Sequence, residues 1–272
     1  MKAREIARHS VLAVSTIVVA SPFLWMVLLS LMPPEQAASG AISLNIDFAA
    51  AQANYLAAIT GTSLPRFLLN GVIICTCTLA LQILFGAPVA FALAKTDFPG
   101  RRVVLALVFI ALLLPREVLV VPLFFLCYQL GILDSYGALI LPGAISPTAI
   151  FLMYQVFRTV PEELIQAARL DGLGYWSIVW KVMVPMSQPV LAAIAILTIV
   201  GRWNDLFWPS IAVTSTDLMP PPMGVLAFRD EEAGTHYGPL MAATVLTTAP
   251  LVIAFLVAQR RFIDSFAGSA AK

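Results

Sequence analysis

The chain has 272 residues, of which 60% are hydrophobic and only 11% are charged. Soluble domains carry about 25% charged residues, so 16 basic and 15 acidic side chains are too few to cover a water-facing surface of this size. This composition, with a net charge of +1, excludes an ordinary soluble enzyme, a disordered chain and a nucleic-acid-binding protein with a basic face.

Six apolar stretches follow one another along the chain. A helix needs about 20 mostly apolar residues to cross the hydrocarbon layer of a bilayer, and each stretch reaches that length. The sequence therefore predicts an all-α, polytopic membrane protein with six transmembrane helices, in which internal prolines are kinks that packing in lipid tolerates. The stretches are residues 10–34, 67–94, 103–133, 135–157, 182–201 and 237–259; five carry no charge, and Arg116 and Glu117 interrupt the third.

The first stretch follows Lys2, Arg4 and Arg8, as the apolar region of a secretory signal would. It is longer than the about 7–15 residues of such a region, so we expect an uncleaved first helix. With the N-terminus inside, the inner segments hold twelve of the 16 basic residues, three in each. Basic residues stay on the cytoplasmic side, which predicts that both termini are cytoplasmic. The inner segments are residues 1–9, 95–102, 158–181 and 260–272.

The inner segment between the fourth and fifth predicted spans contains the signals of a short helix. Thr159 and Glu162 fit the S/T-x-x-E capping box, and Pro161 suits a first helical turn. Gly172 and Gly174 are natural stops. We therefore predict a cytoplasmic helix of about three turns with one charge-poor face, on which small alanines would let another protein approach closely. That face comprises Leu164, Ala167, Ala168 and Asp171.

Two of the predicted outer loops are long. The first, residues 33–65, is rich in small residues and is long enough to fold partly over the outer face. The second, residues 210–237, contains Pro220, Pro221 and Pro222, which predict a stiff, extended spacer. Two interpretations of this second loop stay open: a solvated connection, or a protruding contact for an extracytoplasmic partner.

Ionisable residues at membrane depth occur in the third predicted span and at the end of the fifth. Each costs about 2.5–3.5 kcal/mol at a helix centre, so we expect them to face the protein interior or a water-filled cavity. Asp205 follows Arg202 by three residues, which allows the two to pair on one face. Either these residues form structural pairs near helix ends, or some of them line a solute path. The candidate pathway residues are Arg116, Glu117, Trp203, Asn204 and Asp205.

Two motifs resemble the permease subunits of binding-protein-dependent ABC importers. Residues 166–172, Q-A-A-R-L-D-G, followed by Pro185, are similar to the E-A-A-x-x-D-G-A…P loop of that family. Residues 202–209, R-W-N-D-L-F-W-P, look like the W-N-x-x-x-W-P stretch of its carbohydrate-uptake branch, which includes maltose and glycerol-phosphate permeases. Two positions depart from the family pattern: Gln166 replaces the usual glutamate, and Leu173 replaces the usual alanine.

The resemblance covers about residues 60–265 and implies a mechanism. The short inner helix would be a coupling helix seated in a cleft of a separate ATPase. ATP-driven closure of the ATPase pair would tilt the membrane helices, so that a central site opens alternately to each side. The implied partners are a second homologous permease, an ATP-binding subunit dimer, an extracytoplasmic solute-binding protein and the lipid bilayer of a bacterial plasma (inner) membrane. ATP and Mg would be bound by the ATPase, so this chain would bind no cofactor, contact no nucleic acid and catalyse no reaction.

The same resemblance assigns regions and residues. Residues 1–9 would be a cytoplasmic N-terminus, 10–265 a six-helix permease domain with its coupling-helix loop at 159–187 and an outer loop at 210–237, and 266–272 a cytoplasmic tail. The ATPase-coupling residues would be Glu163, Gln166, Ala167, Ala168, Asp171, Gly172 and Pro185, and the binding-protein contacts would be Arg229, Asp230 and Glu231.

Other classes of function are open to a six-helix membrane protein. A secondary transporter driven by an ion gradient would use buried carboxylates, for which only Glu117 and Asp205 qualify. A membrane enzyme would need a catalytic constellation, whereas His9 and His236 are far apart in sequence and the three cysteines form no metal motif. The chain lacks the G-x-x-x-x-G-K-[ST] phosphate-binding loop, so any ATP would be bound by a partner. An oligosaccharide, an amino sugar or a glycerol-phosphate derivative are all possible solutes.

Overall fold

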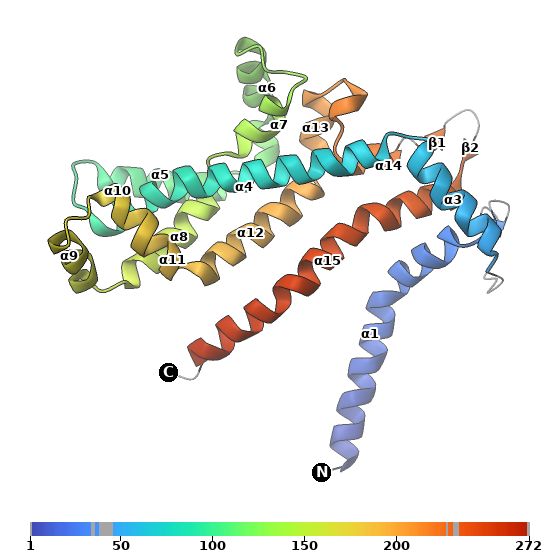
Figure 1. Ribbon diagram of the computed structural model, residues 1–272, viewed down its shortest axis with the longest axis horizontal. Coiled ribbons are helices and arrows are strands. Elements are labelled where there is room, and N and C mark those ends of the chain that lie inside the picture. The colour runs from blue at the N-terminus through green and yellow to red at the C-terminus, as the bar shows by residue number, and fades with distance from the viewer. Residues whose placement is uncertain (1, 34–35, 38–45, 227, 231–233, 271–272) are drawn as a thin grey trace. The chain divides into compact units, whose positions relative to one another are not determined.

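The computed structural model describes the backbone of residues 2–33, 36–37, 46–226, 228–230 and 234–270, and all their side chains except those of residues 2–4, 6–7, 229–230, 234–235 and 257–270. Figure 1 shows that helices dominate these residues, as predicted. The described residues also contain one short antiparallel pair, β1 (Arg229–Asp230) with β2 (Gly234–Thr235).

All six apolar stretches are helical, and two of them are sharply bent. Within the described residues, four helical segments are long and apolar enough to cross a membrane, and the number rises to six if each bent pair is one span. The unbent segments are Arg8–Ser30, Leu64–Lys95, Tyr136–Thr159 and Tyr237–Leu256; the bent pairs are Arg101–Leu113 with Arg116–Gln129, at 104°, and Tyr175–Met186 with Gln188–Trp203, at 83°.

The third stretch does not form the single helix that the sequence predicts. It divides into α5 (Arg101–Leu113), a 3-10 turn η1 (Arg116–Leu119) and α6 (Val120–Gln129). Proline disfavours the helical conformation of the residue before it and donates no backbone hydrogen bond. Leu114, immediately before Pro115, is accordingly extended, with ψ 123°. Because of this break, Arg116 lies in the bend between α5 and α6 and not within a continuous helix.

The chain forms two compact units, of which the first comprises residues 1–68 and 221–252. It contains α1 (Lys2–Ser30), α3 (Phe48–Thr60), α14 (Pro221–Leu226), the β1–β2 pair and the beginning of α15 (Tyr237–Ala270). The sequence missed α3, which lies in the first long loop. Asp47 caps α3, because its carboxylate accepts hydrogen bonds from the backbone of Ala49 at 2.9 Å and Ala50 at 3.4 Å.

A buried asparagine fixes α3 against the end of α1. The side-chain nitrogen of Asn54 donates to the carbonyls of Ser30 at 3.0 Å and Met32 at 2.8 Å. The last carbonyls of a helix have no partner within the helix, so Asn54, which is only 2% exposed, satisfies groups that would otherwise be buried without one. The predicted extended spacer is wrong in the same unit: Pro221 begins α14, because a proline fits the first turn of a helix.

The second unit comprises residues 69–220 and 253–272 and holds the main core. Helix α8 (Pro147–Thr159) packs against both α5 and α12 (Gln188–Trp203) (Figure 1). Ala87 and Ala90 on α4 (Leu64–Lys95) are fully buried in one apolar cluster with Met153 and Phe157 of α8, where small side chains let helices approach closely. Helix α4 begins in the first unit and continues through the second. The further elements of the second unit are α7 (Tyr136–Ile140), η2 (Leu141–Gly143), α9 (Glu162–Leu170), α10 (Tyr175–Ile178), η3 (Val179–Met183), α11 (Val184–Met186), α13 (Phe207–Ala212) and η4 (Thr216–Leu218).

Asp134 joins the turn between α6 and α7 to the segment after α13. Its carboxylate accepts hydrogen bonds from the hydroxyl of Ser215 and from the backbone N–H groups of Thr214 at 2.9 Å and Ser215 at 2.8 Å. These donors, the Ser215 hydroxyl foremost, lower the pKa of the Asp134 carboxyl because they stabilise its charged form. Asp134 also has a positive φ of 54°, a conformation that aspartate tolerates better than most residues.

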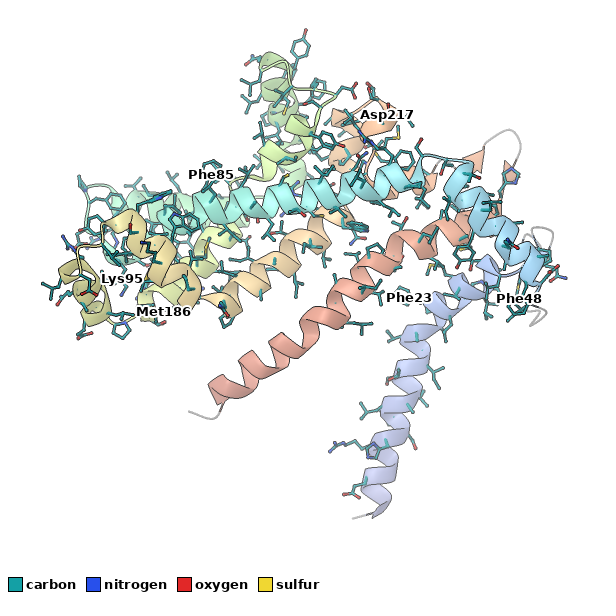
Figure 2. All side chains as sticks on the ribbon, viewed as in Figure 1. Phe23, Phe48, Phe85, Lys95, Met186 and Asp217 are labelled. Atoms are coloured by element: carbon teal, nitrogen blue, oxygen red, sulfur yellow. The ribbon has the colours of Figure 1, made fainter. Side chains whose placement is uncertain are left out.

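Large apolar side chains project from the outer surfaces of the helices. Figure 2 labels Phe23, Phe48 and Phe85, which are 57%, 85% and 47% exposed. A water-soluble protein seldom exposes so many large apolar side chains. Lipid tails solvate such side chains without cost, so this surface fits a helical membrane protein.

Candidate functional site

The predicted inner helix exists as α9, but its first turn is not capped as predicted. Thr159 is the last residue of α8, and its hydroxyl donates to the carbonyl of Val156 at 2.8 Å. Pro161 stands at the N-cap of α9 and makes no side-chain cap. The capping-box prediction is wrong because α8 extends through Thr159 and uses its hydroxyl. The acidic first turn, Glu162 and Glu163, still suits the positive end of the helix dipole.

The predicted stop of α9 at Gly172 is confirmed. Gly172 has φ +83°, in the left-handed region that favours glycine. The N–H of Gly172 donates to the carbonyl of Arg169 and that of Leu173 donates to the carbonyl of Ala168, both at 3.0 Å. This pair of bonds is a Schellman motif. It ends α9 sharply and turns the chain toward α10.

The buried and exposed faces of α9 differ from the prediction at one residue. Ile165 and Ala168, three residues apart, are 3% and 6% exposed and join the core of α8, α10 and η3. Ala168 therefore anchors α9 to its own chain and does not lie on the outer face, because the larger Ile165 sets which side of the helix is buried. On α9 and the turn that follows it, the predicted coupling residues that are exposed are Glu163, Gln166, Ala167, Asp171 and Gly172.

A buried lysine connects the end of α4 to the entrance of α9. The Nζ of Lys95 donates to the carbonyl of Val160 at 2.5 Å and lies 3.6 Å from the Glu162 carboxylate. The Lys95 side chain is only 7% exposed, whereas that of Glu162 is 54% exposed. Lys95 is labelled in Figure 2, at the end of the unit that carries α9. The lysine holds the start of α9 in place through one partly buried hydrogen bond and one partly exposed ion pair.

Pro185, the remaining predicted coupling residue, is exposed in α11, close to the 83° bend before α12. A π-helical turn, Val179–Met183, precedes it. Proline cannot donate the next backbone hydrogen bond, and π-turns commonly accommodate such a local break. Pro185 thus lies in the connection between α9 and α12, and not on α9 itself.

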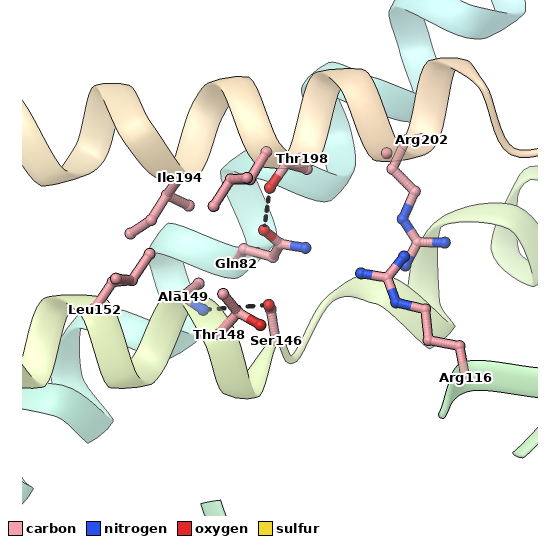
Figure 3. Close-up of a pocket in the computed structure, with 11 residues that line it drawn as sticks. Gln82, Arg116, Ser146, Thr148, Ala149, Leu152, Ile194, Thr198 and Arg202 are labelled. Atoms are coloured by element: carbon pink, nitrogen blue, oxygen red, sulfur yellow. Dashed lines mark hydrogen bonds between the residues drawn. The ribbon is translucent and has the colours of Figure 1, made fainter. Parts of the chain in front are cut away.

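A pocket of about 180 Å³ lies between α4, α8 and α12 (Figure 3). It is lined by polar groups that come from charge-free stretches and by two arginines. An isolated apolar cavity of about 150 Å³ holds one benzene molecule, so this volume can receive one six-membered ring. The lining residues are Gln82, Arg116, Ser146, Thr148, Ala149, Leu152, Ile194, Leu197, Thr198, Gly201 and Arg202.

A chain of hydrogen bonds fixes one wall of the pocket. The Thr198 hydroxyl donates to Oε1 of Gln82 at 2.6 Å, and Nε2 of Gln82 donates to the carbonyl of Gly143 at 2.9 Å. Arg202 lies directly on Gly143, so close that an added Cβ there would stand 2.6 Å from its Cζ. Gly143 therefore supports both Gln82 and the guanidinium of Arg202. A buried polar chain with every member satisfied is rigid.

Arg202 and Asp205 form the ion pair that their spacing allows. Their side chains lie 3.5 Å apart and are 13% and 21% exposed. Asp205 also accepts from the backbone N–H of Trp208 at 3.3 Å, which ties the end of α12 to α13. The Asp205 carboxylate therefore both pairs with Arg202 and attaches α13 to the end of α12.

The predicted pathway residues do not gather in one place. Only Arg116 lines the pocket. Glu117 is exposed outside it, and Asn204 is exposed and donates to the carbonyl of Val200 at 2.9 Å. Trp203 is 4% exposed, so it is a core residue.

Sequence reasoning missed most of the pocket. Gln82 and Thr198 are polar residues within charge-free stretches, a signal that points inward in a membrane protein. Ser146 was missed for another reason: its hydroxyl caps α8 by accepting from Ala149 at 3.3 Å, and it reaches the pocket only because α8 begins there.

The predicted binding-protein contacts fall in the β1–β2 hairpin or beyond the described residues. Arg229 and Asp230 form β1, where their backbones pair with Thr235 and Gly234, and their side chains lie outside the description. Glu231 lies outside the described residues altogether.

Comparison with known proteins gives consistent results. Residues 82–267 match the family described as "Binding-protein-dependent transport system inner membrane component". The arabinooligosaccharides transport system permease protein AraQ of Halalkalibacterium halodurans is 40% identical over 194 residues, which cover 71% of this chain and 69% of the relative. The diacetylchitobiose uptake system permease protein NgcG of Streptomyces coelicolor is 33% identical over 260 residues, covering 94% and 85%.

Two further similarities extend the comparison. The sn-glycerol-3-phosphate transport system permease protein UgpE of Yersinia pestis is 35% identical over 181 residues, which cover 66% of this chain and 64% of the relative. A chain from the crystal structure of a bacterial ABC transporter involved in the import of the acidic polysaccharide alginate has the same fold, with a TM-score of 0.85 at 22% identity. The similarity covers 96% of this chain and 97% of that one.

Proposed function

This chain belongs to the family of binding-protein-dependent transport system inner membrane components, and we propose that the solute it helps to import is a carbohydrate or a polyol phosphate. It is a permease subunit of an ABC importer in the bacterial inner membrane. The named solutes of its relatives are arabinooligosaccharides, diacetylchitobiose and sn-glycerol 3-phosphate. All of them are small and rich in hydroxyl groups, which suits a pocket lined by Gln82, Ser146, Thr148 and Thr198.

We infer a topology in which each bent pair crosses the bilayer as one span. Residues 10–265 are then a permease domain of six spans, and residues 1–9, residues 266–272 and α9 are cytoplasmic. This orientation retains twelve of the 16 basic residues on the cytoplasmic side. The break at Pro115 stays within one span, because non-helical backbone is tolerated at membrane depth where it lines a cavity, and Arg116 lines the pocket.

The observation that carries the coupling role is the division of α9 into two faces. Ile165 and Ala168 attach it to its own chain, while Gln166, Ala167 and Asp171 remain exposed. We propose that the exposed face binds a cleft of a separate ATP-binding subunit, which holds ATP and Mg. Gln166 supplies a neutral hydrogen bond there in place of a charged one, so shape and the sharp turn at Gly172 set the register of docking.

The remaining proposed partners are a second homologous permease and an extracytoplasmic solute-binding protein. Loop 210–237, including Arg229, Asp230 and Glu231, is the proposed contact for the solute-binding protein. An ion-gradient mechanism is less well supported. Of the two carboxylates that it would use, Glu117 is exposed and Asp205 already pairs with Arg202.

Co-purification tests this function. The tagged chain, extracted in mild detergent, is expected to elute with an ATPase and a second permease. Gly172→Asp puts a charge into the docking surface, so the variant chain should no longer elute with the ATPase but should still elute with the second permease. Gly100→Asp is the matched control, because Gly100 is also exposed, in a short loop, with φ +89° and open space around it. A stable monomer without an ATPase would contradict the proposal.

A further inference from the structure

Two guanidinium groups meet at one end of the pocket. Arg202 reaches it from α12, and Arg116 reaches it from η1, just after the Pro115 break. Figure 3 shows the two side chains pointing toward one another across the pocket end. Two positively charged groups that face each other repel, and the free-energy cost of this repulsion grows as water is removed. Such an arrangement at membrane depth marks a functional site by default.

The positive charge at this end is not balanced within the described part of the chain. Arg202 pairs with Asp205 at 3.5 Å. No described carboxylate lies within ion-pair distance of Arg116, including its neighbour Glu117, which does not line the pocket. Two arginines and one aspartate leave a net charge of +1 (2 − 1). An anion between the guanidiniums would relieve the repulsion and complete the balance.

The site is also held in shape before any ligand arrives. The guanidinium of Arg202 rests on Gly143, whose carbonyl accepts from the buried Gln82, and Gln82 in turn accepts from Thr198. Arginine presents its donors as a planar fork that matches carboxylate and phosphate oxygens. A guanidinium fixed in advance loses little conformational freedom when it binds such a group.

We propose that Arg116 and Arg202 bind the anionic group of the transported solute, either the carboxylate of a sugar acid or the phosphate of a polyol ester. This inference rests on the proposed function, and it narrows the solute from any carbohydrate or polyol phosphate to one that carries an anionic group. The 180 Å³ pocket next to the arginines receives the ring or polyol part. The exposed Thr148 hydroxyl is placed to bind one of its hydroxyl groups.

Equilibrium dialysis with radiolabelled probes tests the site directly. The complete permease–ATPase complex, in lipid nanodiscs and without the solute-binding protein, is offered two matched pairs of probes. One pair is an oligoglucuronide and the glucose oligomer of the same length, and the other is glycerol 3-phosphate and glycerol. The native complex is expected to bind the anionic member of at least one pair about tenfold to hundredfold more tightly, the range for a hydrogen bond to a charged group. The pair that shows the preference distinguishes a carboxylate from a phosphate ligand.

Variants of the exposed arginine decide whether this preference comes from the site. Arg116→Gln should remove most of the preference, and Arg116→Lys should keep most of it, because the lysine retains the charge. Arg116 is exposed and makes no ion pair with a described residue, so its replacement should not unfold the chain. Arg102→Gln, on the exposed first turn of α5, removes a basic residue away from the pocket and should change nothing.

The anion site would be overturned if, in both pairs, the anionic and the neutral probe bound equally well or neither bound. It would also be overturned if the Arg116→Gln complex kept the native preference for the anionic probe. Either result leaves the import of neutral carbohydrates intact. Failure of the permease function itself would appear elsewhere, as the absence of an ATPase from the purified complex. The two failures are therefore distinguishable.

Discussion

The ammonium group of Lys95, the last residue of α4, donates a hydrogen bond of 2.5 Å to the carbonyl of Val160, one residue before Pro161 and α9. Both residues belong to the packed end of the second unit, and Val160 is only 7% exposed. A helix that is long and apolar enough to cross the membrane is thus bonded to the entrance of α9, the proposed coupling helix. Force applied to α9 by a partner would pass to α4 through this bond as well as through the apolar anchors of α9.

Replacing Lys95 with methionine should weaken this connection. The change keeps the aliphatic stem but leaves the Val160 carbonyl buried without its donor, which costs about 1–3 kcal/mol. We expect solute uptake per ATP hydrolysed to fall severalfold while the chain remains in the membrane. Lys181→Met is the control, because Lys181 is an exposed lysine in the nearby π-turn. Uptake by the Lys95 variant equal to that of the control would count against the connection.

Gly172→Ala tests the turn that ends α9. The new Cβ would meet no atom within 4 Å, so its effect comes only from the backbone at φ +83°. A non-glycine residue in this conformation costs about 1–2 kcal/mol, and we expect a lower melting temperature and weaker ATPase binding. Gly174→Ala is a matched control, since Gly174 also has open space but a φ of −72°. Gly172→Asn should restore most of the loss, and equal melting of all three variants would refute the conformational requirement.

Gly143→Ala tests the support under Arg202. The added Cβ would collide with the guanidinium, so the arginine must move away from the pocket end although no charge is lost. Overpacking of this kind costs about 1–3 kcal/mol, and we expect both a lower melting temperature and weaker binding of anionic probes. Gly201→Ala also lies at the pocket but adds a Cβ into open space. It should melt at or above the native temperature, and the same behaviour in Gly143→Ala would contradict the contact.

The hydrogen bonds between Asp134 and the segment at Thr214 and Ser215 should stabilise the fold less at acid pH. Hydrogen bonds from Ser215 and Thr214 lower its pKa below the ordinary value of 3.8 in the folded protein. A carboxyl with a lowered folded pKa stabilises the fold above its unfolded pKa, and that contribution is lost as the pH falls through the folded pKa. We expect native protein to melt above Asp134→Asn at neutral pH, with the difference shrinking below about pH 4.

The variant Asp134→Asn suits this test because asparagine tolerates the positive φ of the position. Asp97→Asn is the control: its carboxylate is 97% exposed and pairs with Arg101 at the surface, where such a pair contributes little. A difference in melting temperature between native and Asp134→Asn protein that is independent of pH would contradict the role of the carboxylate.

The helical stretches and the end of α9 were predictable because local signals decide them. Apolar length predicts helices in lipid, and Gly172 ends α9 as the turn chemistry requires. The capping box at Thr159 failed because α8 runs two residues beyond Phe157, where the apolar stretch ends, and takes the hydroxyl for itself. The bend at Pro115 was underestimated, because a proline predicts a break but neighbouring packing decides its angle.

The pocket was less predictable than α9. In its polar wall, Gln82 is hydrogen-bonded to Gly143, 61 residues away in the sequence, and to Thr198, 116 residues away. No local pattern indicates such a contact. Arg202 was assigned correctly to a pair with Asp205, yet its approach to Arg116 depends on the bend of the third stretch. Trp203, one of the predicted pathway residues, is buried because α12 turns its other face to the pocket.

The measurement that tests the central claim most directly is solute uptake into proteoliposomes that contain the purified complex, with its binding protein outside and ATP inside. Uptake is predicted to require ATP, to persist when proton and sodium gradients are collapsed, and to disappear in Gly172→Asp although that chain remains in the membrane. Uptake that survives ATP depletion and collapses with the ion gradient, or that is undiminished in Gly172→Asp, would contradict an ATP-driven permease coupled through α9.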